Sequence, residues 1–421
     1  MSESDMTEPS RNTTGDVRMR GFARRHTVEA AIDLLDAQLH TLDAESLPLQ
    51  QAAGRVLAED VASSVDVPGF DRATMDGYAV LADSTEGATA YNPLPLIVLG
   101  DSFPGRPFGG RVGMGQAVRI MTGAPLPPGC NAVVPAEWID PSSDVSRVNA
   151  LAPVSPGKHV GLRGEDVVSG TTVLHRGRTL RPQDLGLLSS IGRGQVRAIR
   201  KPRVRLIVTG NEILPAGSSP HAHCIVDANG PMLAALAERD GATVSFPGLV
   251  RDERDAILKA LYDDTDVIVV SGGSSVGAED IAPALLAEHG ELLVHGIAMR
   301  PSSPTGFGRL EQRLVFLLPG NPVSCLCGYD FFAGRAIRAL GGRDKLWPYR
   351  SIDAMLARKI SSPIGRLDYV RVRLADGRAE PLATGSASVL SSTTRADGFV
   401  IVPADSEGFA PGADVKVWLY A

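Results

Sequence analysis

The fold is decided by the stretch Val267–Gly277, which reads VIVVSGGSSVG. Its first four residues are all β-branched, which is typical of a strand buried on both faces. Two similar runs, Val204–Val208 and Leu314–Leu318, lie before and after it, and helical spacing appears over Pro231–Arg239 and Asp252–Tyr262. Strands that alternate with helices predict a parallel α/β sheet. We expect a ligand at the carboxyl ends of its strands.

The turn that follows the central strand has the composition of an anion site. Ser271–Gly277 carries three glycines and three serines, whose backbone N–H groups and hydroxyls can cradle a phosphate. It fits neither the Walker pattern nor the dinucleotide pattern, and a plain strand-to-helix turn is an equally good interpretation. The candidate binding residues of this strand-end layer are Gly210, Ser271, Gly272, Gly273, Ser275 and Gly277.

Carboxylates follow the same strands. Glu212 lies at a strand end, Asp280 is expected in the first turn of the helix after the central turn, and Asp227 and Asp252 are expected at neighbouring strand-end or helix-start positions. Oxygen ligands of this kind suit Mg²⁺, so we predict a metal site formed by Glu212, Asp252 and Asp280. A simple helix cap is the alternative role for Asp252.

A rigid turn, Pro319–Pro322, follows the third strand. Asn321 suits a helix cap and Pro322 the first helical position. The same turn could equally shape the wall of a pocket.

Composition limits the classes of function. The chain has 421 residues, of which 43% are hydrophobic and 21% charged, as in an ordinary globular protein. The net charge of −6 argues against a broad nucleic-acid surface. No apolar run approaches the length of a membrane span, and the N-terminus has no apolar centre like that of a secretory signal. We therefore expect a cytoplasmic protein that binds neither nucleic acid nor membrane.

The patterns divide the chain into segments. Thr27 is expected to cap a helix that starts at Val28, a short helix is expected over Pro48–Glu59, and another over Pro182–Ser189. The arginine cluster that ends at Arg25 is interpreted as part of a solvated tail. The predicted segments are a disordered tail (1–24), an N-terminal domain in two pieces (25–65 and 154–200), a β-rich inserted domain (66–153), an α/β domain (201–346) and a small C-terminal β-barrel (347–421).

One further stretch carries a family resemblance. Asp66–Val80, DVPGFDRATMDGYAV, closely resembles the signature of the molybdopterin molybdenumtransferases, the family of MoeA and the gephyrin E domain. Over about residues 25–421, further family motifs follow in order: Ile120–Pro125, Arg163–Asp166, Thr209–Glu212, Ser271–Asp280, Leu318–Ser324 and Gly365–Tyr369.

The resemblance implies a fold and an activity. It implies an elongated homodimer whose α/β domain has the fold of molybdopterin adenylyltransferase, itself a candidate partner. It implies Mg²⁺-assisted insertion of molybdate into adenylylated molybdopterin with release of AMP, in a cleft where strand-end carboxylates of one subunit face the Asp76 loop of the other. The positions that match the family's functional residues are Asp76, Thr122, Asp166, Glu212, Asp252, Asp280, Pro319 and Pro322.

The loop Arg300–Gly308 departs from the family pattern. Ser303 stands where the family has lysine and Thr305 where it has an aromatic residue, while Asn211 replaces an acidic residue and Leu162 an arginine. Arg300 is then the fixed charge of the loop, and we expect it to bind phosphate beside Ser303.

These departures leave two function classes open. One is the transferase. The other is a catalytically weakened paralogue that binds the cofactor or scaffolds partners. An adenylyltransferase is disfavoured, because the stand-alone form of that enzyme lacks Asp66–Val80 and the C-terminal strands.

Overall fold

A computed structural model describes residues 25–141, 144, 146–273, 281–383 and 388–420. The chain forms two compact units. The first consists of Met1–Glu45, Gly54–Val56 and Ile199–Ala421, and the second of Ser46–Ala53 and Leu57–Ala198. The second unit is therefore inserted into the sequence of the first.

The first unit contains the sheet that the apolar runs predict. Its seven strands have the order β16-β13-β18-β22-β21-β19, with β17 paired to β13. The three predicted strands are β13 (Arg203–Thr209), β18 (Val267–Ser271) and β22 (Arg313–Leu318), and they pair in parallel. The others are β16 (Thr243–Ser245), β17 (Leu249–Val250), β19 (Glu291–His295) and β21 (Gly306–Leu310). Because β21 pairs antiparallel with β22 and β19, the sheet is parallel in its core and antiparallel at one edge.

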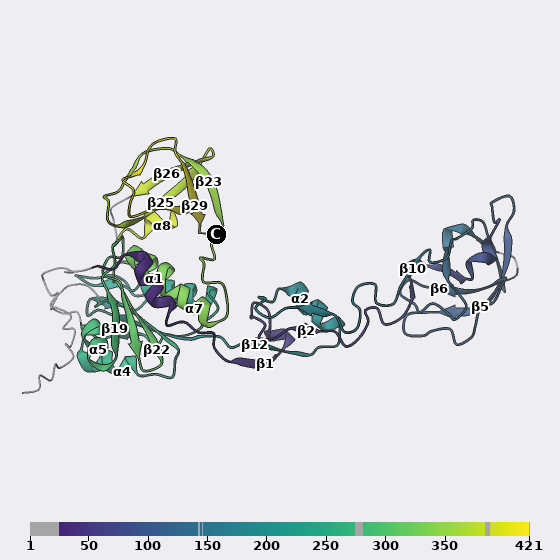
Figure 1. Cartoon of the computed structure of the whole chain (residues 1–421), viewed down its shortest axis with the longest axis horizontal. Coiled ribbons are helices and arrows are strands. Elements are labelled where there is room, and N and C mark those ends of the chain that lie inside the picture. Colours follow the sequence, from purple (N-terminus) through teal and green to yellow (C-terminus); the bar gives the residue numbers. More distant parts are fainter. Residues whose placement is uncertain (1–24, 142–143, 145, 274–280, 384–387, 421) are drawn as a thin grey trace, which may run out of the picture. The chain divides into compact units, whose positions relative to one another are not determined.

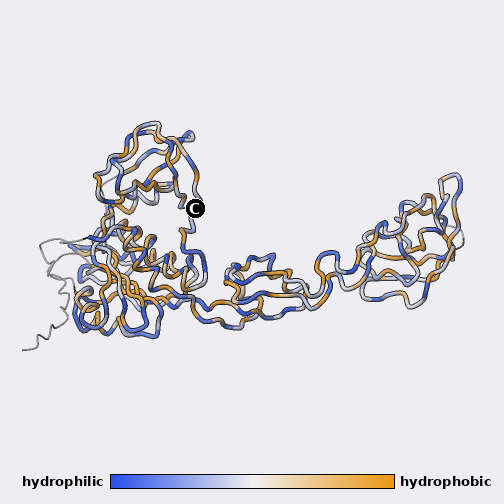
Figure 2. The backbone as a smooth tube through the Cα atoms, viewed as in Figure 1, coloured by the Kyte–Doolittle hydropathy of each residue, from blue (hydrophilic) through white to orange (hydrophobic). Residues whose placement is uncertain are grey.

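Helices cover both faces of this sheet and complete three layers (Figure 1). Successive side chains of a strand point to opposite faces, so Leu206 belongs to one apolar core and Ile207 to the other. Figure 2 shows the hydrophobic residues gathered along these strands. The first core contains residues of α1 (Val28–Asp36), α3 (Asn229–Arg239), α6 (Pro322–Gly328) and α7 (Gly334–Leu340), and the second contains residues of α4 (Arg254–Leu261) and α5 (Ile281–His289). A π-helical turn, η4 (Tyr329–Ala333), joins α6 to α7.

The C-terminal part of the first unit is the predicted barrel. Five strands pair in the closed ring β25-β26-β23-β29-β27-β25 around a core of residues such as Val370, Val400 and Val417. The strands are β23 (Ser351–Leu356), β25 (Leu367–Ala375), β26 (Arg378–Ala383), β27 (Gly398–Val402) and β29 (Asp414–Leu419). One strand of the α/β part, β20 (Met299–Arg300), extends this sheet by pairing in parallel with β25. Shorter elements of the first unit are β14 (Ile213–Leu214), β15 (Ile225–Val226), β24 (Ile360–Ser361), α8 (Ser391–Thr394) and β28 (Gly408–Phe409).

The second unit contains the predicted β-rich part. Its six-stranded sheet has the order β7-β4-β6-β5-β9-β8 and its own apolar core. The strands are β4 (Gly77–Val80), β5 (Leu94–Ser102), β6 (Gln116–Ile120), β7 (Ala132–Pro135), β8 (Ile139–Pro141) and β9 (Arg147–Ala150), with the 3₁₀ turns η2 (Ala82–Thr85) and η3 (Ala136–Trp138).

The rest of the second unit is a smaller body with a separate core. The predicted helix over Pro48–Glu59 is wrong, because only the turn η1 (Leu49–Gln51) forms there and Gly54 then takes a positive φ of 73°. Its other elements are β1 (Ala44–Pro48), which begins in the first unit, β2 (Val61–Ala62), β11 (Thr172–Leu174), α2 (Pro182–Ser190) and β12 (Gln195–Ile199), which ends in the first unit. The paired strands β3 (Arg72–Ala73) and β10 (Val160–Gly161) adjoin the six-stranded sheet instead, because Ala73 and Val160 pack in one core with Ala79 and Ile120 of that sheet. Within the described residues, no helix is both long enough and apolar enough to cross a membrane.

Candidate active site

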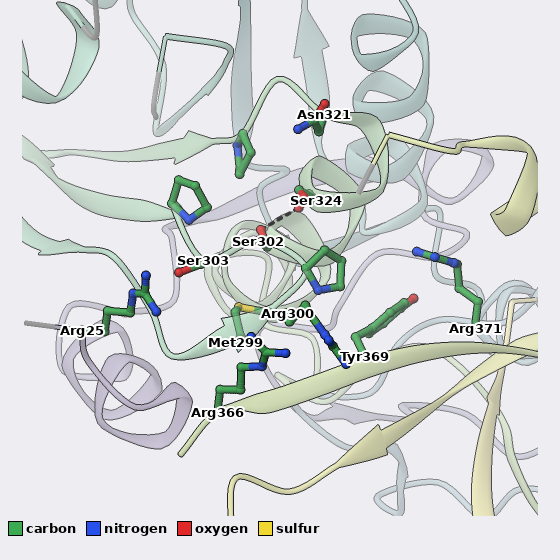
Figure 3. A pocket seen from close by; sticks show the side chains of 13 residues that line it. Arg25, Met299, Arg300, Ser302, Ser303, Asn321, Ser324, Arg366, Tyr369 and Arg371 are labelled. Atoms are coloured by element: carbon green, nitrogen blue, oxygen red, sulfur yellow. Dashed lines mark hydrogen bonds between the residues drawn. The ribbon is translucent and has the colours of Figure 1, made fainter. Parts of the chain in front are cut away.

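A cavity of about 300 Å³ lies in the first unit, where the loop after β20 meets the start of α6 and strand β25 (Figure 3). Four of the residues that line it are arginines and none is acidic. The lining consists of Arg25, Met299, Arg300, Pro301, Ser302, Ser303, Pro304, Pro319, Asn321, Ser324, Arg366, Tyr369 and Arg371. It therefore combines the predicted residues Arg300, Ser303 and Pro319 with arginines that the sequence analysis did not assign to the site.

A buried carboxylate, Asp368, organises two of these arginines. The pairing of β20 with β25 places Arg300 opposite Asp368, which is only 1% exposed. Arg300 Nη2 donates a hydrogen bond to Asp368 Oδ2, and Arg366 Nε lies 3.3 Å from Asp368 Oδ1. Asp368 therefore offsets part of the positive charge of Arg300, which the sequence analysis expected to act as an independent cation.

Some polar atoms around the cavity lack partners. Arg300 Nε and the hydroxyl oxygen of Ser303 are buried and make no hydrogen bond with any described residue. A buried polar group without a partner costs about 1–3 kcal/mol in a folded protein. Such groups at the wall of a cavity indicate a site that a polar ligand completes.

The loop Pro301–Thr305 is held by its hydroxyl groups. Ser302 has a positive φ of 86°, and its hydroxyl donates to the backbone oxygen of Ser324 over 2.6 Å (Figure 3). The hydroxyls of Ser302 and Thr305 lie 2.7 Å apart. Thr305, which stands where the family has an aromatic residue, is fully buried against Gly328, where a Cβ would lie 2.7 Å from its Oγ1. The loop is thus packed tightly onto α6.

The strand-end turns meet at Asn229. Its buried side-chain amide donates to Ser271 Oγ over 2.9 Å and to the backbone oxygen of Gly320 over 2.8 Å. Asp227 accepts hydrogen bonds from the N–H groups of Asn229 and Gly230 and so caps the start of α3. The candidate cradle at Ser271 and the Pro319–Pro322 turn are therefore tied together, and Pro322 is the first residue of α6, as predicted.

The predicted carboxylates fall in different places. Asp252 accepts a hydrogen bond from Thr209 Oγ1, and its own N–H points to Asn211 Oδ1 at 3.4 Å. It does not cap α4, because that helix begins at Arg254 after Glu253. Glu212 lies in the turn after β13, with a carboxylate oxygen 3.0 Å from the Cβ position of Gly210.

The structure describes only two of the three predicted metal ligands, Glu212 and Asp252. Ser275, Gly277 and Asp280 lie outside the described residues. Within the part of the chain that is described, no three His, Cys, Asp or Glu side chains come together as metal ligands.

The second unit brings two further predicted residues together. Asp76 precedes β4 and Thr122 follows the neighbouring β6, so that both the backbone N–H and the hydroxyl of Thr122 donate to Asp76 Oδ1 at 2.7 Å. The hydrogen bond from the backbone N–H, followed by that from the hydroxyl, lowers the pKa of Asp76 below its usual range. Asp166 is exposed, next to the bridge between Val67 and Val167. The second unit therefore presents Asp76, held by Thr122, and the exposed Asp166.

The arginines that the sequence analysis missed come from distant segments. Arg25 precedes α1, and Arg366 and Arg371 flank and belong to β25. Arg366 and Asp368 could have been predicted as site residues, because both belong to the Gly365–Tyr369 motif. Arg25 belongs to an arginine cluster that the sequence analysis interpreted as a solvated tail, whereas the structure places it in the lining of this cavity.

Three family models match the chain and together span most of it. Residues 26–192 match the MoeA N-terminal region (domain I and II), residues 205–339 match a probable molybdopterin binding domain, and residues 353–420 match the MoeA C-terminal region (domain IV). The same segments contain the two units and the barrel described above.

Similar proteins cover nearly the whole length. The chain is 36% identical over 386 residues to molybdopterin molybdenumtransferase 2 of Mycobacterium tuberculosis, covering 89% of this chain and 94% of the relative. It is 30% identical over 400 residues to molybdopterin molybdenumtransferase of Staphylococcus aureus, covering 93% and 95%. A crystal structure of a molybdopterin biosynthesis MoeA protein from Pyrococcus horikoshii matches with a TM-score of 0.80 at 34% identity, over 94% of this chain and 100% of that one.

Proposed function

The chain belongs to the MoeA family, the molybdopterin molybdenumtransferases of molybdenum cofactor biosynthesis, and from that premise we propose that it inserts molybdate into adenylylated molybdopterin with release of AMP. The enzyme is a transferase of that family. The proposal specifies the substrates, the metal and the residues that bind them.

The arginine-lined cavity carries the proposal. Molybdate and the phosphates of an adenylylated pterin are oxyanions, and guanidinium groups bind such anions through paired hydrogen bonds. Arg300 Nε and Ser303 Oγ, buried without partners among the described residues, are donors that an oxyanion would satisfy. The rigid turn at Pro319 would form the opposite wall of the binding site.

The strand-end layer would bind the anhydride. Backbone N–H groups and hydroxyls from Ser271 onward would cradle a phosphate, with Gly210, Gly272, Gly273, Ser275 and Gly277 allowing its close approach. Breaking an anhydride requires positioning and charge neutralisation more than a nucleophile. Glu212, Asp252 and Asp280 would hold Mg²⁺, which would supply that neutralisation. Two of these carboxylates lie among the described residues, and Mg²⁺ is commonly held by one or two carboxylates together with substrate phosphates.

The second unit would supply the remaining polar residues in a homodimer. Asp76 is held ionised by Thr122, and Asp166, in the Arg163–Asp166 motif, is exposed. We place these residues in a cleft that two subunits share, with Asp76, Thr122 and Asp166 of one chain facing the strand-end layer of the other.

One observation favours a weaker alternative, in which the chain is a paralogue that binds or carries the cofactor with little turnover. Ser303 is uncharged, and the neighbouring Arg300 is paired with Asp368. The loop therefore gives less positive charge than a lysine-bearing loop would give.

A transfer assay separates the two functions. Purified protein, adenylylated molybdopterin, molybdate and Mg²⁺ are mixed, and AMP release is followed. We expect turnover that depends on molybdate and stops with EDTA. Glu212→Ala and Asp252→Ala should reduce it by at least ten-fold without lowering the melting temperature, whereas Glu253→Ala, an exposed neighbour, should behave like the wild type. Tight binding of the substrate with no AMP release would identify the carrier function instead.

A further inference from the structure

Hydrogen bonds of the backbone of His26 fix the segment before α1 to the α/β part. His26 forms a β-bridge with Ile297: its N–H donates to the oxygen of Gly296 over 3.1 Å, and its own oxygen accepts from Ala298 over 2.8 Å. Directly after it, Thr27 caps α1 by accepting from the N–H of Ala30. The backbone next to Arg25 is therefore held in place although the residue is exposed.

The same segment adjoins the loop that lines the cavity. Ile297 N–H donates to the oxygen of Ser303 over 2.9 Å, and Gly296 N–H donates to the oxygen of Thr305 over 3.0 Å. Residues 296–298 thus lie between His26 on one side and the loop on the other. This layering brings Arg25 to the cavity wall, where its guanidinium extends on the side of Ser303 (Figure 3).

Arg25 also lines a second cavity. This hollow of about 490 Å³ is formed by Arg25, Thr27, Ala298, Pro363, Ile364, Gly365 and Arg366. Arg25 and Arg366 are common to both cavities and so stand where the two meet. The two cavities therefore adjoin at these two side chains.

Two further arginines of the cavity, Arg300 and Arg366, lie next to a carboxylate. Arg300 and Arg366 share the buried carboxylate of Asp368, so the three groups together carry about one net positive charge. The adjacent Ser303 adds none. Arg25 lines the cavity on the side of Ser303 (Figure 3).

From this placement we propose that Arg25 is a substrate-binding residue that supplies the cation next to Ser303, in the position where a longer basic side chain at residue 303 would otherwise reach. The inference rests on the proposed function, because it assigns one more residue to the same anion site. It makes the N-terminal segment part of the active site, and it predicts that charge can be exchanged between residues 25 and 303.

The test measures binding of molybdate by calorimetry, which requires no turnover. Arg25→Gln should weaken binding about ten-fold, equivalent to about 1.4 kcal/mol, while Arg25→Lys should retain most of the affinity. Adding Ser303→Lys to Arg25→Gln should restore affinity to near the wild-type value, a rescue that a purely structural role for Arg25 would not give. Arg251→Gln removes the same charge at an exposed residue that lines neither cavity and should bind normally.

Two results would overturn the inference in distinguishable ways. If Arg25→Gln binds molybdate like the wild type while Arg366→Gln binds weakly, the cavity is the anion site and Arg25 has no part in it. If neither the wild type nor any variant binds molybdate, the proposed function of the cavity fails together with the role of Arg25. Melting temperatures equal to that of the wild type establish that the variants are folded.

Discussion

Asn229 connects two turns that belong to different strands. Its amide nitrogen faces the backbone oxygen of Gly320, which can only accept a hydrogen bond, so the orientation of the amide is fixed. The same nitrogen donates to Ser271 Oγ. This side chain therefore links the candidate phosphate cradle to the turn at Pro319, in addition to the backbone pairing of β18 with β22.

Replacement of Asn229 should show this dependence. Asn229→Ala removes two buried hydrogen bonds and should lower the free energy of unfolding by about 1–3 kcal/mol. Asn229→Asp should cost more, because it buries a carboxylate oxygen against the oxygen of Gly320. Urea unfolding measures both changes. An Asp variant as stable as the wild type would contradict the orientation described here.

Asp330 is a buried carboxyl with an unusual proton affinity. It lies in η4, where the hydroxyl of Tyr349 donates to it over 2.9 Å, Arg239 Nη2 lies 3.5 Å away, and Asp240 adds a second negative charge nearby. Burial raises the pKa of Asp330 to about 6, and the positive charge of Arg239 offsets part of that effect.

This pKa predicts a pH-dependent stability. An unfolded aspartate titrates near 3.8, so between that pH and about 6 the folded state holds a proton that the unfolded state has lost, and raising the pH favours unfolding. The contribution of Asp330 should fall by up to about 3 kcal/mol between pH 4 and pH 7. Asp330→Asn should remove this slope, and Asp353→Asn, an exposed control, should keep it. Urea midpoints across that pH range provide the measurement, and parallel curves for wild type and Asp330→Asn would contradict the assignment.

At the level of elements, the predictable part of the fold was the part built from apolar runs. Val204–Val208 and Val267–Val270 read as buried strands and lie in β13 and β18. Strand β21 was not predicted, because Gly306 and Gly308 weaken its strand pattern. The structure gives their reason: a Cβ at Gly308 would lie 2.0 Å from the oxygen of Glu291 on the paired strand. The close contact between β21 and β19 therefore requires glycine, and glycine removes the hydrophobic pattern by which a strand is predicted.

Gly272 illustrates a similar constraint at a strand end. It has a φ of 98°, and a Cβ there would lie 2.2 Å from the oxygen of Thr209. Gly217 has a φ of 90° with no atom within 4 Å of its Cβ position. Both glycines therefore require the left-handed conformation, but only Gly272 also requires the absence of a side chain.

The matched pair of alanine variants separates these two effects. Gly217→Ala should cost about 1 kcal/mol of unfolding free energy through backbone strain. Gly272→Ala should cost a further 1–3 kcal/mol, approximately, because β18 must move away from β13. Urea unfolding measures the difference, and AMP release should fall in Gly272→Ala alone. Equal free energies of unfolding for the two variants would show that the end of β18 accommodates a side chain at residue 272.

At the level of the whole molecule, the predicted site residues are divided between the two units. Asp76, Thr122 and Asp166 belong to the second unit, and Glu212 and Asp252 to the first. The sequence motifs identified these residues individually, but no local pattern states which chain supplies each one. The shared cleft of a homodimer and the five-segment division of the chain stay predictions.

Mixing two inactive variants tests the shared cleft. Chains with Asp76→Ala and chains with Glu212→Ala, unfolded together and refolded, should regain about a quarter of the wild-type AMP release, because half of randomly formed dimers are mixed and each mixed dimer has one intact cleft. A cleft built within one chain would give no recovery. Light scattering on the same samples reports whether dimers form at all.

Because the second unit is inserted into the first, the ribosome makes helix α1 well before the strands on which it packs. Helix α1 buries Val28, Ala31 and Leu35 in a core whose strands begin only at Val204. At about 5–20 residues per second, the helix leaves the ribosome on the order of ten seconds before those strands are made. During this interval the β-rich part of the second unit can fold by itself, since the buried residues of its core end at Val154. The apolar face of α1 remains uncovered meanwhile, so a chaperone that binds exposed apolar helices can bind it.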